Sequence, residues 1–176
     1  TMMATMPGLP MFGHGQIEGF SEKYGMEYMR AYSDEKPDPA LVARHEREIF
    51  PLLRRRKLFA EVDHFHLFDF MTDDKGHVDE NVFAYSSGRN EERALIFYNN
   101  FWQRSSGKIT TGSSYSEQDK DGKRYLKTVF LSQALALDTG ADNFLVAREL
   151  RSGLWHLYRC SDLAENGWRV NLEGYQ

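Results

Sequence analysis

A change in hydrophobic period near residue 62 is the feature that most constrains what this chain can fold into. Before that point, apolar side chains recur at the three- and four-residue spacing of a helix. Beyond it, short aromatic and β-branched runs alternate with turn-forming residues, which is the pattern of antiparallel strands. A chain of 176 residues has room for one ordinary domain, or for one small domain and a portion of another. We therefore expect two regions, residues 1–62 and residues 63–176.

The helical region is predicted to begin at Asp38 and Pro39. The aspartate carboxylate can accept from an unpaired backbone N–H, and proline at the first helical position needs no donor. Pro51 lies inside the helical pattern and should kink the helix or divide it. We interpret the basic run from Arg54 to Lys57 as a solvated helix end that suits the negative pole of the helix dipole. The apolar stripe consists of Leu41, Val42, His45, Ile49, Leu52 and Leu53.

The second region predicts an antiparallel meander with one or two short helices. The residues 86–90 have turn chemistry and should separate two strands. The continuously apolar run 94–98 predicts a central strand that is buried on both faces. Residues 126–137 predict a helix with Phe130, Ala134 and Leu137 facing inward. The strands are predicted at residues 65–70, 82–85, 93–98, 144–147, 154–158 and 168–172.

Composition narrows the range of partners. The formal charge of −4 and the isoelectric point of about 5.9 give no electrostatic reason to expect nucleic acid. No apolar stretch is long enough for a membrane span, and the first residues lack the pattern of a signal peptide. Cys160 is the single cysteine, so neither a disulfide framework nor a cysteine-based zinc site can form. We expect no nucleic acid, membrane, cofactor or metal; the compartment stays open, with the cytoplasm slightly favoured.

Three further patterns imitate known sites. Residues 13–19 resemble a dinucleotide glycine motif, but the third glycine is one place late and no helix opens there. His64 and His66 share one face of an expected strand, as metal ligands can, yet the lack of a third ligand favours solvent-facing histidines. Residues 117–122 imitate the start of a calcium loop. Because Thr128 stands where a bidentate glutamate is required, a polar hairpin turn is the better interpretation.

The most informative stretch is Gly8-Leu9-Pro10-Met11-Phe12-Gly13-His14-Gly15-Gln16-Ile17-Glu18. Its apolar first half predicts a buried strand that ends at Phe12, and its glycine-rich second half predicts a tight polar loop. Barrel enzymes keep their active sites at strand ends of this kind, whereas a purely structural turn is the alternative. The candidate substrate-binding residues are His14, Gln16 and Glu18.

This stretch resembles the alpha-amylase family of glycoside hydrolases, in which the last barrel strand is followed by a pattern like Gly-Ile-Pro-x-x-x-x-Gly-x-Glu. Gly8, Leu9, Pro10 and Gly15 fall on that pattern, and the acid is displaced by one place to Glu18. The helix at residues 38–57 resembles the final barrel helix of the family. Residues 81–85 and 92–100 are similar to the first hairpin of its C-terminal β-sandwich.

The resemblance implies a mainly β fold with α elements. Residues 1–62 would be the last strand and helix of a (β/α)₈ barrel, and residues 63–176 an antiparallel β-sandwich domain. It also implies a parent enzyme that acts on α-glucans with retention, through a carboxylate nucleophile and a carboxylic acid. Both belong to strands upstream of Thr1, so no catalytic residue is expected in this chain. The implied partners are an α-glucan or oligosaccharide substrate and the remainder of the barrel.

Trp102, Trp155 and Trp168 raise a second class of function, a carbohydrate-binding module whose exposed rings stack on sugars. Coplanar rings exposed on one sheet face would favour that class. A third class is a structural domain that covers the end of the barrel, which burial of the same rings against the helix at residues 38–57 would favour. The glucan, the choice between hydrolysis and transfer, and the oligomeric state are left open by the sequence.

Overall fold

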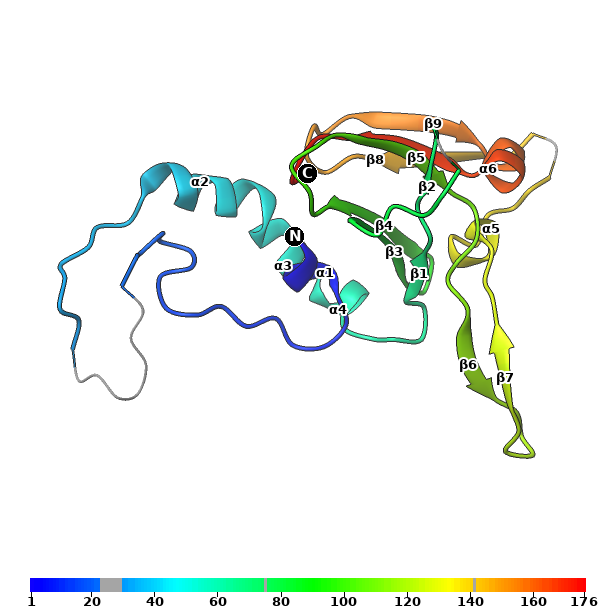
Figure 1. Ribbon diagram of the computed structural model, residues 1–176, viewed down its shortest axis with the longest axis horizontal. Helices are drawn as coiled ribbons and strands as arrows, with labels where there is room; N and C mark the ends of the chain where they lie inside the picture. The colour runs from blue at the N-terminus through cyan, green and yellow to red at the C-terminus, as the bar shows by residue number, and fades with distance from the viewer. Residues whose placement is uncertain (23–29, 75, 141) are drawn as a thin grey trace. The chain divides into compact units, whose positions relative to one another are not determined.

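The computed structural model describes residues 1–22, 30–74, 76–140 and 142–176. The chain divides into two compact units, Thr1–Ala60 and Glu61–Gln176. The first unit is helical and the second is built mainly of antiparallel strands (Figure 1). The protein is therefore mainly β with some helix, as the sequence predicts.

The helices of the first unit follow the local signals in the sequence. Asp38 caps α2, because its Oδ1 accepts from the backbone N–H groups of Ala40 and Leu41 at 2.8 and 3.2 Å. The helical run is interrupted at Ile49, and Pro51 lies in the first turn of the next helix. The predicted start and the predicted division are thus both confirmed. The helices are α1 (Met2–Thr5), α2 (Pro39–Glu48), α3 (Phe50–Arg54) and α4 (Arg56–Phe59).

We predicted a solvated helix end for the basic run that contains Arg56, and for this residue the prediction is wrong. Its guanidinium donates from Nη1 to the carbonyl oxygen of Ala4 at 2.9 Å, and from Nη2 to those of Met6 at 2.7 Å, Gly8 and Phe59. A guanidinium presents five donors in a fixed fork, so one side chain can hold several carbonyl groups at once. Arg56 therefore fastens the first residues of the chain to α4.

The buried strand predicted up to Phe12 is not formed. A short helix, α1, occupies the beginning of the segment, and residues 9–13 have no regular structure. Leu9 and Met11 are 89% and 74% exposed. A strand needs a neighbour to pair its backbone groups, and the described part of this unit contains no strand.

The second unit contains two small antiparallel sheets. Neither closes into a barrel within the residues that the structure describes. One sheet has the order β1-β3-β4, with β1 (His66–Phe68), β3 (Val82–Arg89) and β4 (Glu92–Asn99). The other has the order β10-β5-β2, with β2 (Met71–Thr72), β5 (Ser105–Ile109) and β10 (Trp168–Leu172).

One hydrophobic cluster joins the two sheets and α5 (Leu131–Ala134). Side chains of β1 and β3 meet side chains of β5 and β10 in this cluster, so neither sheet has a separate core. Burial of apolar surface of this kind is the main favourable contribution to folding. The buried members are Phe68, Phe70, Val82, Ala84, Ile109, Val129, Leu131, Ala134, Leu135 and Leu172.

Asn99, at the end of β4, is fully buried and organises the neighbouring loop. Its Nδ2 donates to the carbonyl oxygens of Gln103 at 2.7 Å and Glu173 at 3.1 Å. Its Oδ1 accepts from the backbone N–H of Phe101 at 3.1 Å. The carboxamide therefore joins the turn after β4 to the segment after β10.

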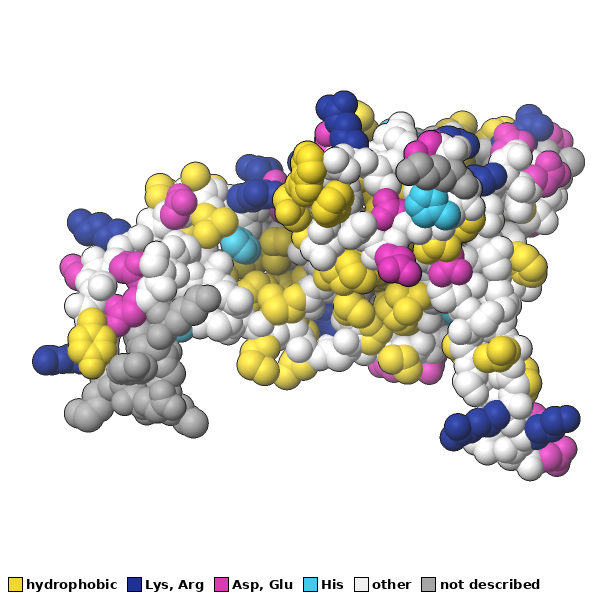
Figure 2. All heavy atoms as spheres, in the orientation of Figure 1, with side chains coloured by type: hydrophobic (Ala, Val, Ile, Leu, Met, Phe, Trp, Pro, Cys, Tyr) yellow, Lys and Arg dark blue, Asp and Glu magenta, His cyan; other side chains and the backbone are white. Residues whose placement is uncertain are grey.

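Two hairpins complete the unit: β6 (Tyr115–Gln118) with β7 (Arg124–Lys127), and β8 (Phe144–Arg148) with β9 (Trp155–Arg159). The helix α6 (Cys160–Asn166) follows β9. The β6–β7 hairpin projects from its unit, and basic and acidic side chains gather at its tip (Figure 1, Figure 2). Its turn closes through Asp119, whose Oδ1 accepts from the N–H groups of Asp121 and Lys123. The expected polar hairpin turn is confirmed.

Three details of the strand region differ from our expectations. The run 94–98 lies in β4, which is an edge strand, whereas β3 is central. Ser86 and Ser87, predicted as turn residues, are buried within β3. Residues 126–137 do not form one helix, because residues up to Lys127 pair in β7 and only α5 is helical. Phe130, predicted to face inward, is exposed.

Candidate functional site

The glycine-rich loop at residues 13–19 is a compact turn anchored to the start of α2. The carbonyl oxygen of Gly15 accepts from the N–H groups of Gly19 and Phe20 at 2.7 and 3.0 Å. Gly15 has a φ of +71°, and a Cβ atom there would lie 2.5 Å from the Cβ of Phe20. Only glycine fits this position without strain. The N–H of Asp38 donates to the carbonyl oxygen of Glu18 at 2.8 Å, which ties the loop to the helix cap.

The three candidate binding residues are placed differently within this loop. His14 is exposed, and its ring centroid lies 5.5 Å from that of Phe20. The Oε1 of Gln16 accepts from the backbone N–H of Gly13 at 2.7 Å, so this side chain helps to close the turn. Glu18 is half-buried and contributes its backbone carbonyl to the bond with Asp38. His14 is the one of the three that lines the cavity described next.

Two glutamates join the segment after the loop to the segment before α2. The carboxylate of Glu35 accepts from the N–H groups of Ser21 and Glu22, both at 2.9 Å. The carboxylate of Glu22 accepts in turn from the N–H groups of Tyr32 and Ser33 at 2.7 and 2.8 Å. Each side chain therefore binds the backbone beside the other, and we call this arrangement the glutamate clasp.

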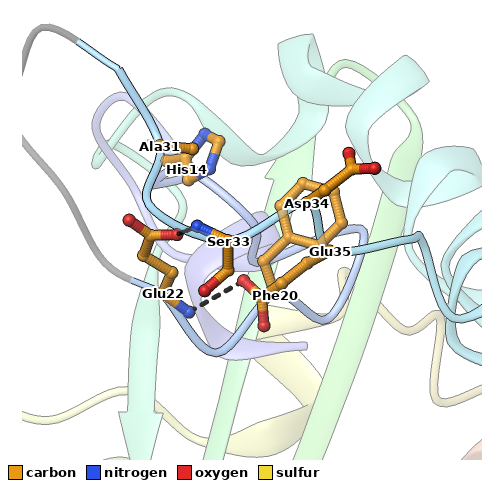
Figure 3. Close-up of a pocket in the computed structure, with 7 residues that line it drawn as sticks. All are labelled: His14, Phe20, Glu22, Ala31, Ser33, Asp34 and Glu35. Carbon is orange, nitrogen blue, oxygen red and sulfur yellow. Dashed lines mark hydrogen bonds between the residues drawn. The ribbon is translucent and has the colours of Figure 1, made fainter.

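The glutamate clasp borders a small cavity of about 170 Å³. In Figure 3, the carboxylates of Glu22 and Glu35 lie on this cavity together with the hydroxyl of Ser33, and the ring of Phe20 forms part of the wall. Carboxylates accept hydrogen bonds, a hydroxyl donates and accepts, and an aromatic ring provides an apolar surface. The lining residues are His14, Phe20, Glu22, Ala31, Ser33, Asp34 and Glu35.

The backbone bonds keep one of these carboxyl groups in its charged form. The N–H groups of Glu22 and Ser21 hold the pKa of Glu35 below its ordinary value, against a smaller opposing effect of burial. A general acid in glycoside hydrolysis needs a raised pKa instead. At neutral pH, Glu35 is therefore suited to accept hydrogen bonds from ligand hydroxyls and not to protonate a leaving group.

Sequence reasoning missed most of this cavity. Residues 20–36 mix aromatic and charged side chains without a clear period, which predicts a loop with one helical turn. The described residues of that range are not helical, and residues 23–29 lie outside the described part of the chain. The clasp joins Ser21 and Glu22 to Tyr32, Ser33 and Glu35. The spacing of hydrophobic residues carries no information about hydrogen bonds of this kind. The repeated pairing of serine with an acidic residue, at 21–22 and 33–34, is the signal that was available.

The second unit presents exposed aromatic rings. Trp102 and Trp155 are exposed, whereas Trp168 packs against the core and lies 4.5 Å from Tyr158 between ring centroids. Arg148 lies over the ring of Trp155 at 5.7 Å. Among the described residues, no group of three or more histidine, cysteine, aspartate or glutamate side chains is arranged to hold a metal ion. Cys160 is buried, as a bystander thiol would be.

His66 is the one histidine of the β1–β3 ladder. It faces Ser86 across the strands, and its ring lies 6.3 Å from that of Tyr115. Within the described part of the chain, its Nδ1 and the Oγ of Ser86 are buried without a hydrogen-bond partner. Burial lowers the pKa of His66, and the nearby His64 and Lys127 lower it further. The prediction of solvent-facing histidines therefore holds for His64, which is exposed, whereas His66 is half-buried and its neutral form is favoured.

Comparison of the chain with protein-family models, with curated proteins and with solved structures gave no match. No helix in the described parts of the chain has the length and apolar character that crossing a membrane requires.

Proposed function

We propose that this chain is the C-terminal portion of an alpha-amylase-like glycoside hydrolase that acts on α-glucans. The nucleophile and the general acid would lie in strands outside this sequence. Residues 1–62 would contribute the end of the barrel, and residues 63–176 a β-sandwich domain. The proposal rests on Gly8, Leu9, Pro10 and Gly15, which fall on the family pattern, together with the properties of the segment that carries them.

The observation that carries the proposal is the exposure of apolar side chains in that segment. Leu9 and Met11 are 89% and 74% exposed, although they flank the proline of the motif. In a barrel, this segment would pair with neighbouring strands and both side chains would have packing partners. The helix α2 also lacks packing partners for its apolar side. Leu41 and Val42 form an apolar stripe, yet no residue of the helix is buried.

The cavity beside the loop supports an association with sugars. Sugar hydroxyls both donate and accept hydrogen bonds, and the carboxylates, the hydroxyl and the imidazole of the lining can pair with both roles. In a barrel, the segment after the last strand borders the mouth of the active site. His14 would then contact bound substrate, and Glu35 would accept from its hydroxyls.

The arrangement of the second unit is compatible with a sandwich. Two antiparallel sheets contribute side chains to one shared cluster, as the two inner faces of a sandwich do. In the proposed enzyme, this domain covers apolar surface of the barrel.

The decisive experiment uses the complete coding sequence that surrounds this segment. We expect an aspartate on the fourth barrel strand and a glutamate on the fifth. The full-length protein should cleave or transfer a maltooligosaccharide with retention at the anomeric carbon, and NMR of the products measures this outcome. The isolated chain should release no reducing sugar. An upstream sequence without a barrel, or a full-length protein that is inert toward α-glucans, would refute the proposal.

The variant His14→Ala in the full-length protein separates binding from chemistry. Loss of one neutral hydrogen bond should raise KM by about a few-fold to tenfold and leave kcat within about tenfold. Glu18→Gln should behave in the same way. A thousandfold fall in kcat with the fold intact would show that the residue is catalytic and that our alignment with the family is wrong.

A second candidate function is a non-catalytic carbohydrate-binding module. The exposure of Trp102 is the observation that favours it. Affinity electrophoresis of the isolated chain in gels that contain soluble amylopectin distinguishes the two proposals. Retardation that Trp102→Ala abolishes and His14→Ala leaves intact would favour the module. Retardation lost only with His14→Ala would assign binding to the loop.

A further inference from the structure

The β8–β9 hairpin has one face that is apolar and exposed to solvent. Side chains alternate between the two faces of a strand, and one set packs toward the core through Tyr158 and Trp168. The opposite set includes Phe144 at 49%, Val146 at 58% and Leu157 at 66% exposure. We call this set the outer face, and it consists of Phe144, Val146, Arg148, Trp155, Leu157 and Arg159.

The outer face has a diagonal pattern of charges and rings. Phe144 is paired with Arg159 at one end of the ladder, and Arg148 with Trp155 at the other end. Val146 and Leu157 form the pair between them. The two rings therefore occupy one diagonal, and the two guanidinium groups occupy the other. Each guanidinium lies over the ring beside it, at 5.7 Å for Arg148 and 5.6 Å for Arg159.

We propose that the outer face binds the outer face of a second copy of this chain. The diagonal pattern is self-complementary under two-fold symmetry, which is the usual symmetry of homodimers. If the axis runs along the strands, Phe144 faces Arg159 of the second copy and Trp155 faces Arg148. If the axis runs across the strands, Phe144 faces Arg148 and Trp155 faces Arg159. In both arrangements each ring position of the ladder faces an arginine position, and no arginine position faces another.

The centre of the face is complementary in the same way. Val146 faces Leu157 of the second copy under the first arrangement, and each residue faces its own counterpart under the second. The aromatic and arginine side chains are of the types that contribute most to protein interfaces. Because each ring already carries its own guanidinium, a flat sugar would have to displace an arginine before it could stack. A protein face that brings further rings and charges does not have this obstacle.

The size of the face sets the strength of the association. Stable interfaces use about 20–30 residues on each side, whereas the outer face has six, which Leu150 and Leu154 in the connecting turn can extend. We therefore expect a weak dimer, with a dissociation constant between about 10 μM and 1 mM.

The first test is sedimentation equilibrium of the full chain from about 10 μM to about 1 mM. Leu157→Asp should raise the dimer dissociation constant by about tenfold or more, because it places a charge at the centre of the apolar contact. Leu126→Asp is the matched control, since Leu126 is 77% exposed on the separate β6–β7 hairpin. That variant should dimerise like the unchanged chain. Circular dichroism verifies that both variants are folded.

The second test identifies the axis by cross-linking with a flexible bis-maleimide, because packed sheets lie about 10 Å apart and a disulfide does not bridge Cα atoms more than about 7 Å apart. Val146→Cys should be cross-linked to itself if the axis runs across the strands, and to Leu157→Cys in a mixture if it runs along them. The unchanged chain is the background control, because its Cys160 is buried. The proposal is overturned if the chain stays monomeric at the highest concentration. It is also overturned if Leu157→Asp does not weaken the association, or if neither cysteine combination cross-links above the level of Leu126→Cys.

Discussion

Glu22 and Glu35 each hold the backbone next to the other, because each carboxylate accepts two hydrogen bonds from backbone N–H groups there. This reciprocal arrangement holds Ser21 and Glu22 beside Tyr32, Ser33 and Glu35 through hydrogen bonds to charged acceptors. Its strength therefore depends on the ionisation of the carboxylates, since a protonated carboxyl group is a weaker acceptor.

The first prediction concerns the pH dependence of this clasp. The pKa of Glu35 is lowered in the folded chain by the N–H groups of Glu22 and Ser21. The folded state therefore gains from ionisation of Glu35 above its ordinary pKa, and it loses that gain as the pH falls through the lowered value. An NMR titration should show the amide resonances of Ser21 and Glu22 moving with a midpoint below the pKa of a glutamate in an unfolded peptide.

A variant gives the matched comparison. Glu35→Gln should shift the same two amide resonances at neutral pH, because the charged acceptor is lost. Glu46→Gln, on the exposed side of α2, should leave them in place. A titration midpoint at or above the peptide value would show that the clasp does not form in solution.

The second prediction concerns Arg56. Arg56→Lys keeps the charge but cannot present a fork of donors to the carbonyl groups of Ala4, Met6 and Gly8. Residues 1–8 should then open more easily, by about 1.5–3 kcal/mol if the lost bonds behave like other hydrogen bonds to charged groups. Hydrogen exchange of this segment measures the change.

Arg54→Lys is the control for this variant, because Arg54 is exposed at the end of α3. It should leave the exchange of the first residues unaltered. Equal exchange in the two variants would mean that Arg56 does not hold the segment.

The third prediction concerns His66. Burial keeps its pKa in the folded chain below the value in the unfolded chain, and His64 and Lys127 act in the same direction. As the pH falls through the unfolded pKa, the unfolded chain takes up the proton first, so stability decreases. Urea unfolding should give a lower free energy at pH 5.5 than at pH 7.5, and His66→Gln should reduce this difference. His77→Gln removes an exposed histidine of the same unit and should preserve the full difference.

The fourth prediction concerns Asn99. Asn99→Ala removes three hydrogen bonds and leaves the partner groups of Gln103, Glu173 and Phe101 without their acceptor or donor. The free energy of unfolding of the second unit should fall by about 2–4 kcal/mol. Asn100→Ala changes the exposed neighbour and should cost less than about 0.5 kcal/mol. Urea titration of both variants supplies the measurement; similar stabilities would contradict the proposed role.

The sequence predicts the elements whose signals are local. The cap at Asp38 and the break near Pro51 depend on neighbouring residues, and both are found. Short apolar runs predict six strands in the second unit, and five of the six predicted positions coincide with a strand over most of their length. The exception is the run 65–70, of which only His66–Phe68 forms β1. The strands β2, β5, β6 and β7 have no such run and were not predicted.

Features that depend on distant residues could not be predicted in this way. Ser86 and Ser87 have the composition of turn residues, yet they lie buried inside β3, where Ser86 is paired with His66 of β1 and Leu95 of β4. Arg56 resembles its exposed basic neighbours, and only the folded path of the first eight residues distinguishes it. The cavity residues are brought together by the glutamate clasp, which spans more than ten positions of the sequence.

The β6–β7 hairpin has a consequence for how chains of this type can diverge. Its turn is closed by the side chains of Asp119 and Gln118, and all four residues of β7 are exposed. Insertions at Lys120 to Gly122 would lengthen the hairpin without disturbing the shared cluster of the two sheets. By contrast, β5 is paired on both sides, and a Cβ atom at Gly107 would lie 2.2 Å from the carbonyl oxygen of Met71. In evolutionary descendants of this sequence, length should therefore vary at the hairpin tip while Gly107 is retained.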